Sequence, residues 1–381
     1  DYGRTPGGRR TKSSGMTCFL MSVLTALITL LYFRLHGEAL FVGGMTAAAE
    51  FELKRNGVQN TAFRDRISEY ASVGPGGRKY VVVTASNYAY RRLFVNFECM
   101  MRYWKVDNVV VNALDKSMHD YAFEKGYNVF NIIGNKKVSD TQLELPFHQG
   151  TRQFNYVTFL KFMLPLKVLQ EGYDVIYSDL DVGFYGDFTK ELYSHPEDLV
   201  TISDQGITEK PPNSLLGSGL FLARSSPGTI EVFFDLLRKG FHSFGKVEDQ
   251  TLWNEVLCSS GRVGRDKCLL SVNEGEVYVH VLDREVYSPL SEFRSAKPMA
   301  VHFNKLYGRQ QKWRQLYESK SWFLTYNGTC DPHRGRITVI QVEDGPQAQP
   351  PQPPAAPPAQ PPKPAPLAVN NPPPAKPAVA A

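Results

Sequence analysis

The sequence is poor in two features that mark particular classes of protein: cysteine and concentrated charge. Lysine and arginine (43) exceed aspartate and glutamate (38) by only a formal charge of +5, and the basic residues are spread along the chain. Proteins that bind nucleic acid carry a basic patch or stripe, so nucleic acid is not indicated as a partner. Hydrophobic residues make up 42% of the 381-residue chain, enough for the core of one large domain or two small ones.

With five cysteines, the chain is not a cysteine-dense mini-protein. Cys18 lies in an apolar run. The other four cysteines could form two disulfides in an oxidising compartment, with three possible pairings. Cys258 and Cys268 are close in sequence and are the favoured pair. The alternative is four buried free thiols.

One long hydrophobic run lacks charge, residues 16–33, MTCFLMSVLTALITLLYF. Its length is at the lower end for a membrane-spanning helix, and basic residues precede it. We predict a cytoplasmic basic tail at 1–15 and an uncleaved transmembrane signal anchor at 16–33. A cleaved signal peptide is the alternative.

Two further segments are predicted to lie outside the folded domain. Residues 34–78 are interpreted as a stem, which ends at the break GPGG. Residues 343–381 hold more than half of the prolines and cannot build a core, so they predict a disordered proline-rich tail. Between them, residues 79–342 are expected to form the catalytic domain.

In this central part, strands and helices alternate. Apolar runs at 80–85, 108–113, 129–133 and 175–178 predict strands, and the segments between them have helical spacing. This order predicts an α/β fold with a Rossmann-type, mostly parallel sheet flanked by helices. Ligands of such sheets bind at the carboxyl ends of the strands, where Thr84, Asn87, Asp179 and Asp181 fall.

The most informative stretch is residues 172–183, GYDVIYSDLDVG. A buried strand leads directly into Asp179 and Asp181, two carboxylates one residue apart. Alternate side chains of a strand point the same way, so the two carboxylates repel each other unless a cation lies between them. A hard divalent metal, which also binds phosphate oxygens, suits this arrangement. A surface turn or a helix cap is the structural alternative.

Several motifs, in this order, resemble the nucleotide-diphospho-sugar transferase domain of plant and algal glycosyltransferase family 77. They are VVVTASN at 81–87, KFMLP at 161–165, the stretch 172–182, DQTLWN at 249–254, and VHFN at 301–304 with Gly308 and Lys312. The resemblance implies a GT-A fold, a UDP-sugar donor, Mn²⁺ (or Mg²⁺) as cofactor, and a retaining transfer.

The resemblance also implies a metal site and a phosphate site. Asp179, Asp181 and His302 would hold the metal, and an imidazole ligand favours Mn²⁺ over Mg²⁺. The alternative for His302 is a core histidine. Gly308 would let the backbone approach the diphosphate, and Lys312 would neutralise the departing nucleotide. Lys305, Arg309 and Arg314 are rivals for this last role.

Further residues are expected to face the sugar and the acceptor. Lys161 would steady the metal carboxylates and the donor, unless it is an exposed helix lysine. Asp249 and Gln250 would be the catalytic residues, although Asp249 could merely cap a helix. The donor-binding set is then Thr84, Asn87, Lys161, Asp179, Asn304, Gly308 and Lys312.

The sequence therefore predicts a single-pass type II protein of the Golgi membrane with a lumenal catalytic domain. The acceptor triplet for N-glycosylation at Asn327-Gly-Thr329 agrees with a lumenal position. By resemblance, the enzyme would move a pentose or galactose from a UDP-sugar to a hydroxyl of a cell-wall polysaccharide or a glycoprotein. The alternatives are a UDP-sugar hydrolase and a non-catalytic, membrane-tethered scaffold that acts through the proline-rich tail.

Overall fold

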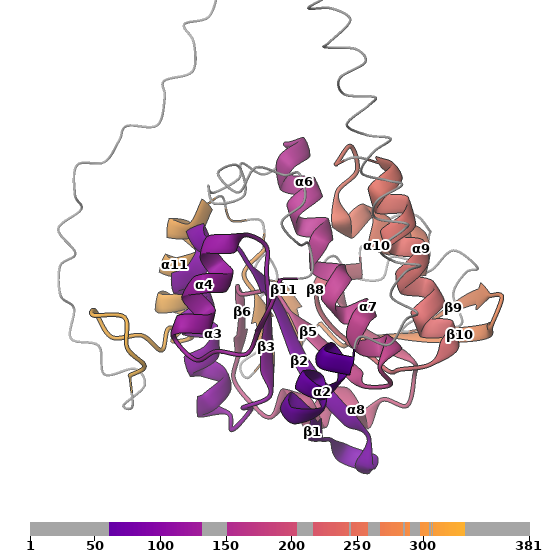
Figure 1. Ribbon diagram of the computed structural model, residues 1–381, viewed down its shortest axis with the longest axis horizontal. Coiled ribbons are helices and arrows are strands. Elements are labelled where there is room, and N and C mark those ends of the chain that lie inside the picture. Colours follow the sequence, from indigo (N-terminus) through magenta and orange to yellow (C-terminus); the bar gives the residue numbers. More distant parts are fainter. Residues whose placement is uncertain are drawn as a thin grey trace, which may run out of the picture. The chain divides into compact units, whose positions relative to one another are not determined.

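The computed structural model (Figure 1) describes residues 61–131, 151–203, 216–243, 245–257, 267–284, 286–289, 298–304, 306 and 308–331. The predicted basic tail, signal anchor and proline-rich tail, and residues 34–60 of the predicted stem, lie outside these residues. Within the described part of the chain, no helix is both long and apolar enough to cross a membrane.

A mixed sheet of nine strands forms the centre of the fold, in the order β4-β3-β2-β5-β8-β7-β10-β9, with β1 beside β2. Strands β4, β3, β2, β5, β7 and β10 run in one direction, whereas β1, β8 and β9 run in the other. The predicted α/β fold with a mostly parallel sheet is confirmed, and β8 is an antiparallel insertion between β5 and β7. The strands are β1 (Ser72–Val73), β2 (Lys79–Ser86), β3 (Val109–Ala113), β4 (Val129–Phe130), β5 (Asp174–Ser178), β7 (Leu199–Ser203), β8 (Leu216–Ala223), β9 (Lys267–Val272) and β10 (Gly275–Val281).

A second, three-stranded sheet continues from the end of β5. It consists of β11 (Tyr287–Pro289), β12 (Ala300–His302) and β6 (Val182–Phe184). Strand β6 begins directly after Asp181, and β12 pairs antiparallel with it, so that His302 lies opposite Val182. This pairing brings a residue more than a hundred positions further along the chain next to the Asp179–Asp181 turn.

Helices pack against the large sheet, and their ends follow local sequence signals. For example, Asp115 precedes α4 and its side chain accepts a hydrogen bond from Met118 N at 2.7 Å, which satisfies an end-of-helix N–H. The α-helices are α2 (Thr61–Tyr70), α3 (Arg91–Tyr103), α4 (Lys116–Glu124), α6 (Arg152–Phe159), α7 (Met163–Gln170), α8 (Phe188–Ser194), α9 (Pro227–Ser243), α10 (Asp249–Leu257) and α11 (Gly308–Glu318), and the short 3₁₀ turns are η1 (Pro75–Gly77), η2 (Tyr88–Tyr90) and η3 (Leu160–Phe162).

An aromatic cluster in the core fixes the short η3 turn. The ring of Phe162 stacks on Trp253 of α10 with a centroid distance of 5.4 Å, and it also contacts Phe221 of β8 and Phe233 of α9. All four side chains are fully buried. Burial of such large rings stabilises a fold by about 2 kcal/mol or more per ring. Since Lys161 is the neighbour of Phe162, this packing also determines where the Lys161 side chain begins.

The described part of the predicted stem packs on the sheet. Ile67 of α2 is fully buried, the ring of Phe63 lies 4.8 Å from that of Phe130, and β1 pairs with β2. In the structure, folded residues therefore reach at least back to Thr61, ahead of the predicted start at Lys79. The apolar positions of α2 explain this, because they would otherwise be exposed to water.

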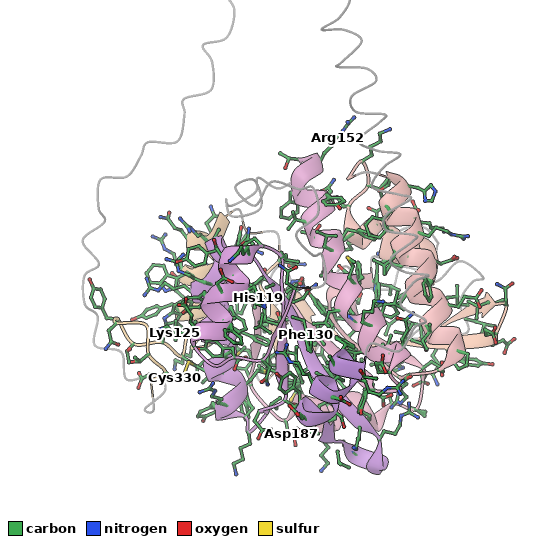
Figure 2. All side chains as sticks on the ribbon, viewed as in Figure 1. His119, Lys125, Phe130, Arg152, Asp187 and Cys330 are labelled. Carbon is green, nitrogen blue, oxygen red and sulfur yellow. A yellow bond between two sulfur atoms is a disulfide. The ribbon has the colours of Figure 1, made fainter. Side chains whose placement is uncertain are left out.

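A disulfide joins Cys99 in α3 to Cys330, across 231 positions of sequence (Figure 2). Cys268 of β9 is also disulfide-bonded. Cys258, its predicted partner, lies outside the described residues, so the Cys258–Cys268 pair stays a prediction.

Candidate active site

A cavity of about 360 Å³ opens where the connections of the large sheet change direction. The chain passes from β2 to β3 and β4 on one side of β2, and then returns to β5 on the other side. Ligands of open α/β sheets bind at such a switch point, outside the carboxyl ends of the strands. Ten of the residues predicted from sequence line the cavity: Asn87, Lys161, Asp179, Asp181, Asp249, Gln250, His302, Asn304, Gly308 and Lys312.

Thr84 is the exception, and its predicted place beside the nucleotide is corrected. Its side chain is fully buried in β2, and its hydroxyl has no hydrogen-bond partner among the described residues. The three residues that follow it, Ala85, Ser86 and Asn87, are the ones that line the cavity. The predicted strand at 80–85 agrees with β2 to within one residue at each end, so Thr84 lies inside the strand and not at its carboxyl end.

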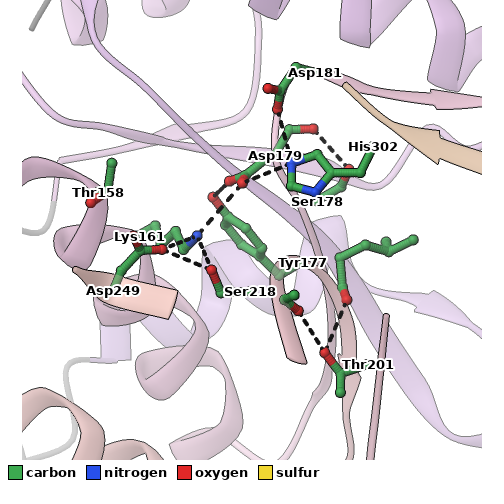
Figure 3. A network of polar contacts seen from close by, with 12 residues as sticks. Thr158, Lys161, Tyr177, Ser178, Asp179, Asp181, Thr201, Ser218, Asp249 and His302 are labelled. Atoms are coloured by element: carbon green, nitrogen blue, oxygen red, sulfur yellow. Dashed lines mark hydrogen bonds and ion pairs between the residues drawn. The ribbon is translucent and has the colours of Figure 1, made fainter. Parts of the chain in front are cut away.

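The predicted metal ligands converge at the end of β5 (Figure 3). His302 Nε2 lies 3.5 Å from Asp181 Oδ1 and 3.7 Å from Asp179 Oδ2, and one ligand atom from each residue falls within 4.8 Å of the others. Two carboxylates and one imidazole are a ligand set that suits Mn²⁺ or another divalent ion with affinity for both oxygen and nitrogen. The residues present therefore fit a divalent metal.

The two carboxylates have opposite shifts in acidity. Burial raises the pKa of Asp179; Lys161 opposes this shift and Asp181 adds to it. Burial would also raise the pKa of Asp181, but Lys312 and His302 outweigh it and hold the pKa well below its usual range. The positive charges of Lys312 and His302 therefore stabilise the ionised form of Asp181 strongly. The ionised form of Asp179 is less well compensated, so an added cation would stabilise it more.

Lys161 links the candidate metal-binding carboxylates to the predicted catalytic carboxylate. Its side chain is 6% exposed, and its Nζ lies 2.6 Å from Asp249 Oδ2, 3.0 Å from Ser218 Oγ and 3.6 Å from Asp179 Oδ2. Burial lowers the pKa of Lys161, yet the charges of Asp179 and Asp249 outweigh it and raise the pKa above its usual value. Lys161 is therefore a buried, charged bridge and not an exposed helix lysine.

Asp249 is the first residue of α10, where the helix dipole favours a negative charge. Ser218 Oγ donates to its Oδ2 at 2.8 Å. Although burial opposes ionisation, Lys161 and these hydrogen bonds lower the pKa of Asp249 below its usual value. Asp249 is thus held as a carboxylate facing the cavity, with Gln250 beside it.

The start of α11 supplies the predicted phosphate side of the cavity. Gly308 has φ = +76°, a left-handed conformation that other residues adopt only with strain. One turn later, Lys312 Nζ forms an ion pair of 2.6 Å with Asp181 Oδ2. Of the rivals considered from sequence, Arg309 donates to the Ala89 carbonyl, and Lys305 lies outside the described residues.

Two site residues were not found from sequence. Tyr177 Oη donates a hydrogen bond of 2.6 Å to Asp179 Oδ1 and so orients that carboxylate. Gly219 of β8 lies against the candidate metal ligands, because a Cβ added there would collide with the His302 ring and with Asp179 Oδ2. Strand alternation could have suggested Tyr177, which is two residues before Asp179. Nothing local in the sequence marks Gly219.

The described residues contain a second group that combines histidine and carboxylate ligands. His195, Glu197 and His280 place one ligand atom each within 4.8 Å of one another. The two imidazole rings stack at 3.9 Å, and Lys267 Nζ lies 2.6 Å from Glu197 Oε1. None of these residues lines the cavity.

Comparisons with known proteins agree with the motifs. A family model described as nucleotide-diphospho-sugar transferase matches residues 105–316, more than half of the chain. The beta-arabinofuranosyltransferase RAY1 of Arabidopsis thaliana is 31% identical over 214 residues, which cover 54% of this chain and 38% of that protein. The chain thus spans little more than a third of the length of that curated relative.

Two solved structures are more distant. Mouse xyloside xylosyltransferase 1 is 14% identical, with a TM-score of 0.35 over 59% of this chain and 98% of that one. The galactosyltransferase LgtC, in complex with donor and acceptor sugar analogues, is 13% identical, with a TM-score of 0.37 over 58% of this chain and 86% of that one.

Proposed function

The chain belongs to the nucleotide-diphospho-sugar transferase family, and on this premise we propose that it transfers a sugar from a UDP-sugar to a hydroxyl group of a glycan or glycoprotein. The observation that carries the proposal is the convergence of Asp179, Asp181, His302 and Lys312 beside one cavity at the switch point of the sheet. Two carboxylates would repel a bare diphosphate, so a cation is needed between the carboxylates and the diphosphate.

Asp179, Asp181 and His302 would hold this cation, for which we propose Mn²⁺. When bound, the metal would neutralise negative charge on the diphosphate as the bond to the sugar breaks. Lys312 lies next to the same carboxylates and brings a second positive charge to the leaving group. Gly308 carries no side chain, so its backbone N–H can approach phosphate oxygens at the start of α11.

At the other end of the network, Asp249 would act on the sugar. Its lowered pKa keeps it ionised, so it suits a nucleophile, a base or a stabiliser of positive charge at the anomeric carbon, and it does not suit a proton donor. Lys161 positions Asp249 and Asp179 relative to each other, and Asn87, Gln250 and Asn304 can donate or accept hydrogen bonds at the cavity wall. For the stereochemistry we propose a retaining transfer, which the resemblance implies.

The finer parts of the proposal rest on less direct support. The name of the relative, a beta-arabinofuranosyltransferase, supports a pentose donor, with galactose as the second choice. The Cys99–Cys330 disulfide supports an oxidising compartment. This agrees with the proposed Golgi location, with the anchor at 16–33 and the catalytic domain in the lumen.

The test is a donor panel with the full chain. UDP binding is measured by calorimetry with Mn²⁺ and with EDTA, and sugar transfer is measured with UDP-pentoses and UDP-hexoses in the presence of glycan acceptors. We expect UDP binding that requires the metal, and turnover that rises well above water hydrolysis when the acceptor is present. Wild-type protein that binds no UDP with Mn²⁺ contradicts the proposal. Turnover that no acceptor increases would instead favour the hydrolase.

A further inference from the structure

Near the end of the described residues, a small hairpin carries a sequence motif that has no part in the proposed transfer reaction. Asn327-Gly-Thr329 is the single Asn-x-Ser/Thr triplet in the sequence. This triplet is the acceptor for N-linked oligosaccharides when it is exposed to the secretory lumen. Neither the cavity nor the proposed transfer reaction uses these residues.

The hairpin presents the motif at its tip. Leu324 and Cys330 form an antiparallel bridge, and Thr325 N donates to the Thr329 carbonyl at 2.8 Å. Gly328 turns the chain with φ = +81°. Asn327 and Thr329 are both exposed, so a large group attached at Asn327 meets no packed neighbour.

The polar side chains of the motif contact one another. Thr329 Oγ1 lies 3.0 Å from Asn327 Oδ1, and Thr325 Oγ1 also donates to this oxygen. The amide oxygen is thereby occupied by hydroxyl donors, which leaves the amide nitrogen as the group to be modified. The hydroxyl of the third residue, which defines the motif, is beside the amide of the first.

Two observations favour an oxidising environment for this hairpin. Cys330, at its base, is bonded to Cys99, and Cys268 also forms a disulfide. Disulfides persist in the secretory pathway and are rare in the cytosol. The adjacent Tyr326 is 71% exposed, and its ring offers an apolar face against which a sugar can pack.

We infer that Asn327 carries an N-linked oligosaccharide. In the transfer, the amide nitrogen of Asn327 forms a bond to the anomeric carbon of a lipid-diphosphate oligosaccharide. The bond from that carbon to the phosphate oxygen breaks, the lipid diphosphate leaves with the bonding electrons, and the nitrogen gives up one proton. The hairpin residues do not line the cavity, so the glycan covers the hairpin and leaves the site open.

The experiment expresses the full chain in eukaryotic cells and compares its gel mobility before and after treatment with peptide-N-glycosidase. We expect the treatment to remove one glycan from wild type and to convert Asn327 to aspartate in the peptide spectrum. Asn327→Gln and Thr329→Ala should run at the deglycosylated position without treatment, whereas Thr329→Ser should keep the glycan. The matched control is Asn273→Gln, the same change at an exposed asparagine outside any acceptor triplet, which should keep it as well.

Disulfide mapping of the same samples makes each result decisive. Unmodified Asn327 in a chain whose Cys99–Cys330 bond has formed would overturn the inference, because the hairpin then reached an oxidising lumen and was not glycosylated there. Unmodified Asn327 with a free Cys330 would overturn it too, since the chain then never met that lumen. A glycan lost in Asn273→Gln would show that the modified site is elsewhere.

Discussion

The fold contains two groups of histidine and carboxylate side chains among its described residues, and only one of them lines the cavity. The first, Asp179, Asp181 and His302, follows the carboxyl end of β5 and lines the cavity. The second, His195, Glu197 and His280, lies where β7 begins, with Glu197 two residues before the strand and His280 level with Val200. Both bring their ligand atoms within 4.8 Å, so their chemistry alone does not separate them.

What separates them is the surroundings. The cavity group has its cations arranged around it, on η3 and α11, and a glycine strand position that leaves room beside it. In the second group, Lys267 pairs with Glu197 at 2.6 Å and the two rings stack on each other, and none of its three members lines the cavity. A set of ligands becomes a candidate active site when the sheet places it at the switch point, beside open space.

The largest expected effect comes from the same amide substitution made in each group. Asp181→Asn keeps the shape of the side chain but removes the charge that a divalent metal needs, so kcat/KM for sugar transfer should fall about 10²–10³-fold. Glu197→Gln should leave kcat/KM unchanged within about twofold, because Glu197 does not line the cavity.

Steady-state kinetics over a range of Mn²⁺ concentrations measures this comparison, with circular dichroism to confirm that both variants fold. Equal losses in the two variants would contradict the distinction between the groups. So would full activity of Asp181→Asn.

The next effect compares two lysine–carboxylate pairs that have the same N–O distance but differ in the burial of the lysine. The Lys161–Asp249 and Lys267–Glu197 pairs both measure 2.6 Å, whereas the lysine side chains are 6% and 41% exposed. Lys161→Met should lower the free energy of unfolding by about 3–5 kcal/mol, because it leaves buried carboxylates without a cation. Lys267→Met should lower it by less, about 1 kcal/mol, because water reaches the Lys267 side chain, although the Glu197 side chain that it leaves behind is only 7% exposed.

Urea unfolding followed by fluorescence measures both values. If the two substitutions lower the free energy of unfolding equally, the burial of the lysine does not determine how much each pair contributes to stability. An Asp249→Asn change made on top of Lys161→Met should recover part of the lost stability, because it removes one of the unpaired charges.

A smaller effect is expected from one added methyl group. A Cβ at Gly219 would collide with His302 and Asp179, so Gly219→Ala should displace the metal ligands and lower kcat/KM about 10–100-fold. The free energy of unfolding should change less than in Lys161→Met, because flexible side-chain atoms can move away. Calorimetric titration with Mn²⁺ should show weaker binding, and unchanged Mn²⁺ affinity would exclude a displaced ligand.

Much of the site could be predicted because its chemistry falls at strand ends. The apolar run before Asp179 and the alternation of strands and helices are local signals, and the rule of carboxyl-end binding turns them into a location. His302 came instead from family resemblance. Its approach depends on β12 pairing with β6, which no local period in the sequence reveals.

The errors and omissions have physical reasons of the same kind. Thr84 was assigned to the strand end although the predicted strand ran on to residue 85, and in the structure its side chain is fully buried within β2. The burial of Lys161 depends on Phe162 stacking on Trp253, a contact between distant segments. Gly219 could not be found, since its importance is the absence of an atom next to side chains from β12 and the β5 turn.

The last test compares the opposite pKa shifts of the site carboxylates with Glu98, a buried carboxylate whose ion-pair partner is exposed. Glu98 of α3 is buried, and Arg102, with which it forms an ion pair of 3.8 Å, is 60% exposed. Burial therefore raises the pKa of Glu98 to about 7, from 4.5. Between these values the folded protein keeps a proton that the unfolded chain has lost, so stability falls as pH rises.

This contribution is fully present below pH 4.5 and is lost as the pH rises through about 7. Within the window, the free energy of unfolding of wild type should fall relative to Glu98→Gln by roughly 1.4 kcal/mol per pH unit. Urea unfolding of both proteins at several pH values gives the difference, in which the titration of all other groups cancels. Parallel curves would mean that Glu98 titrates normally. In that case burial would also fail to explain the raised pKa of Asp179. The lowered pKa of Asp181, which comes from Lys312 and His302, would be unaffected.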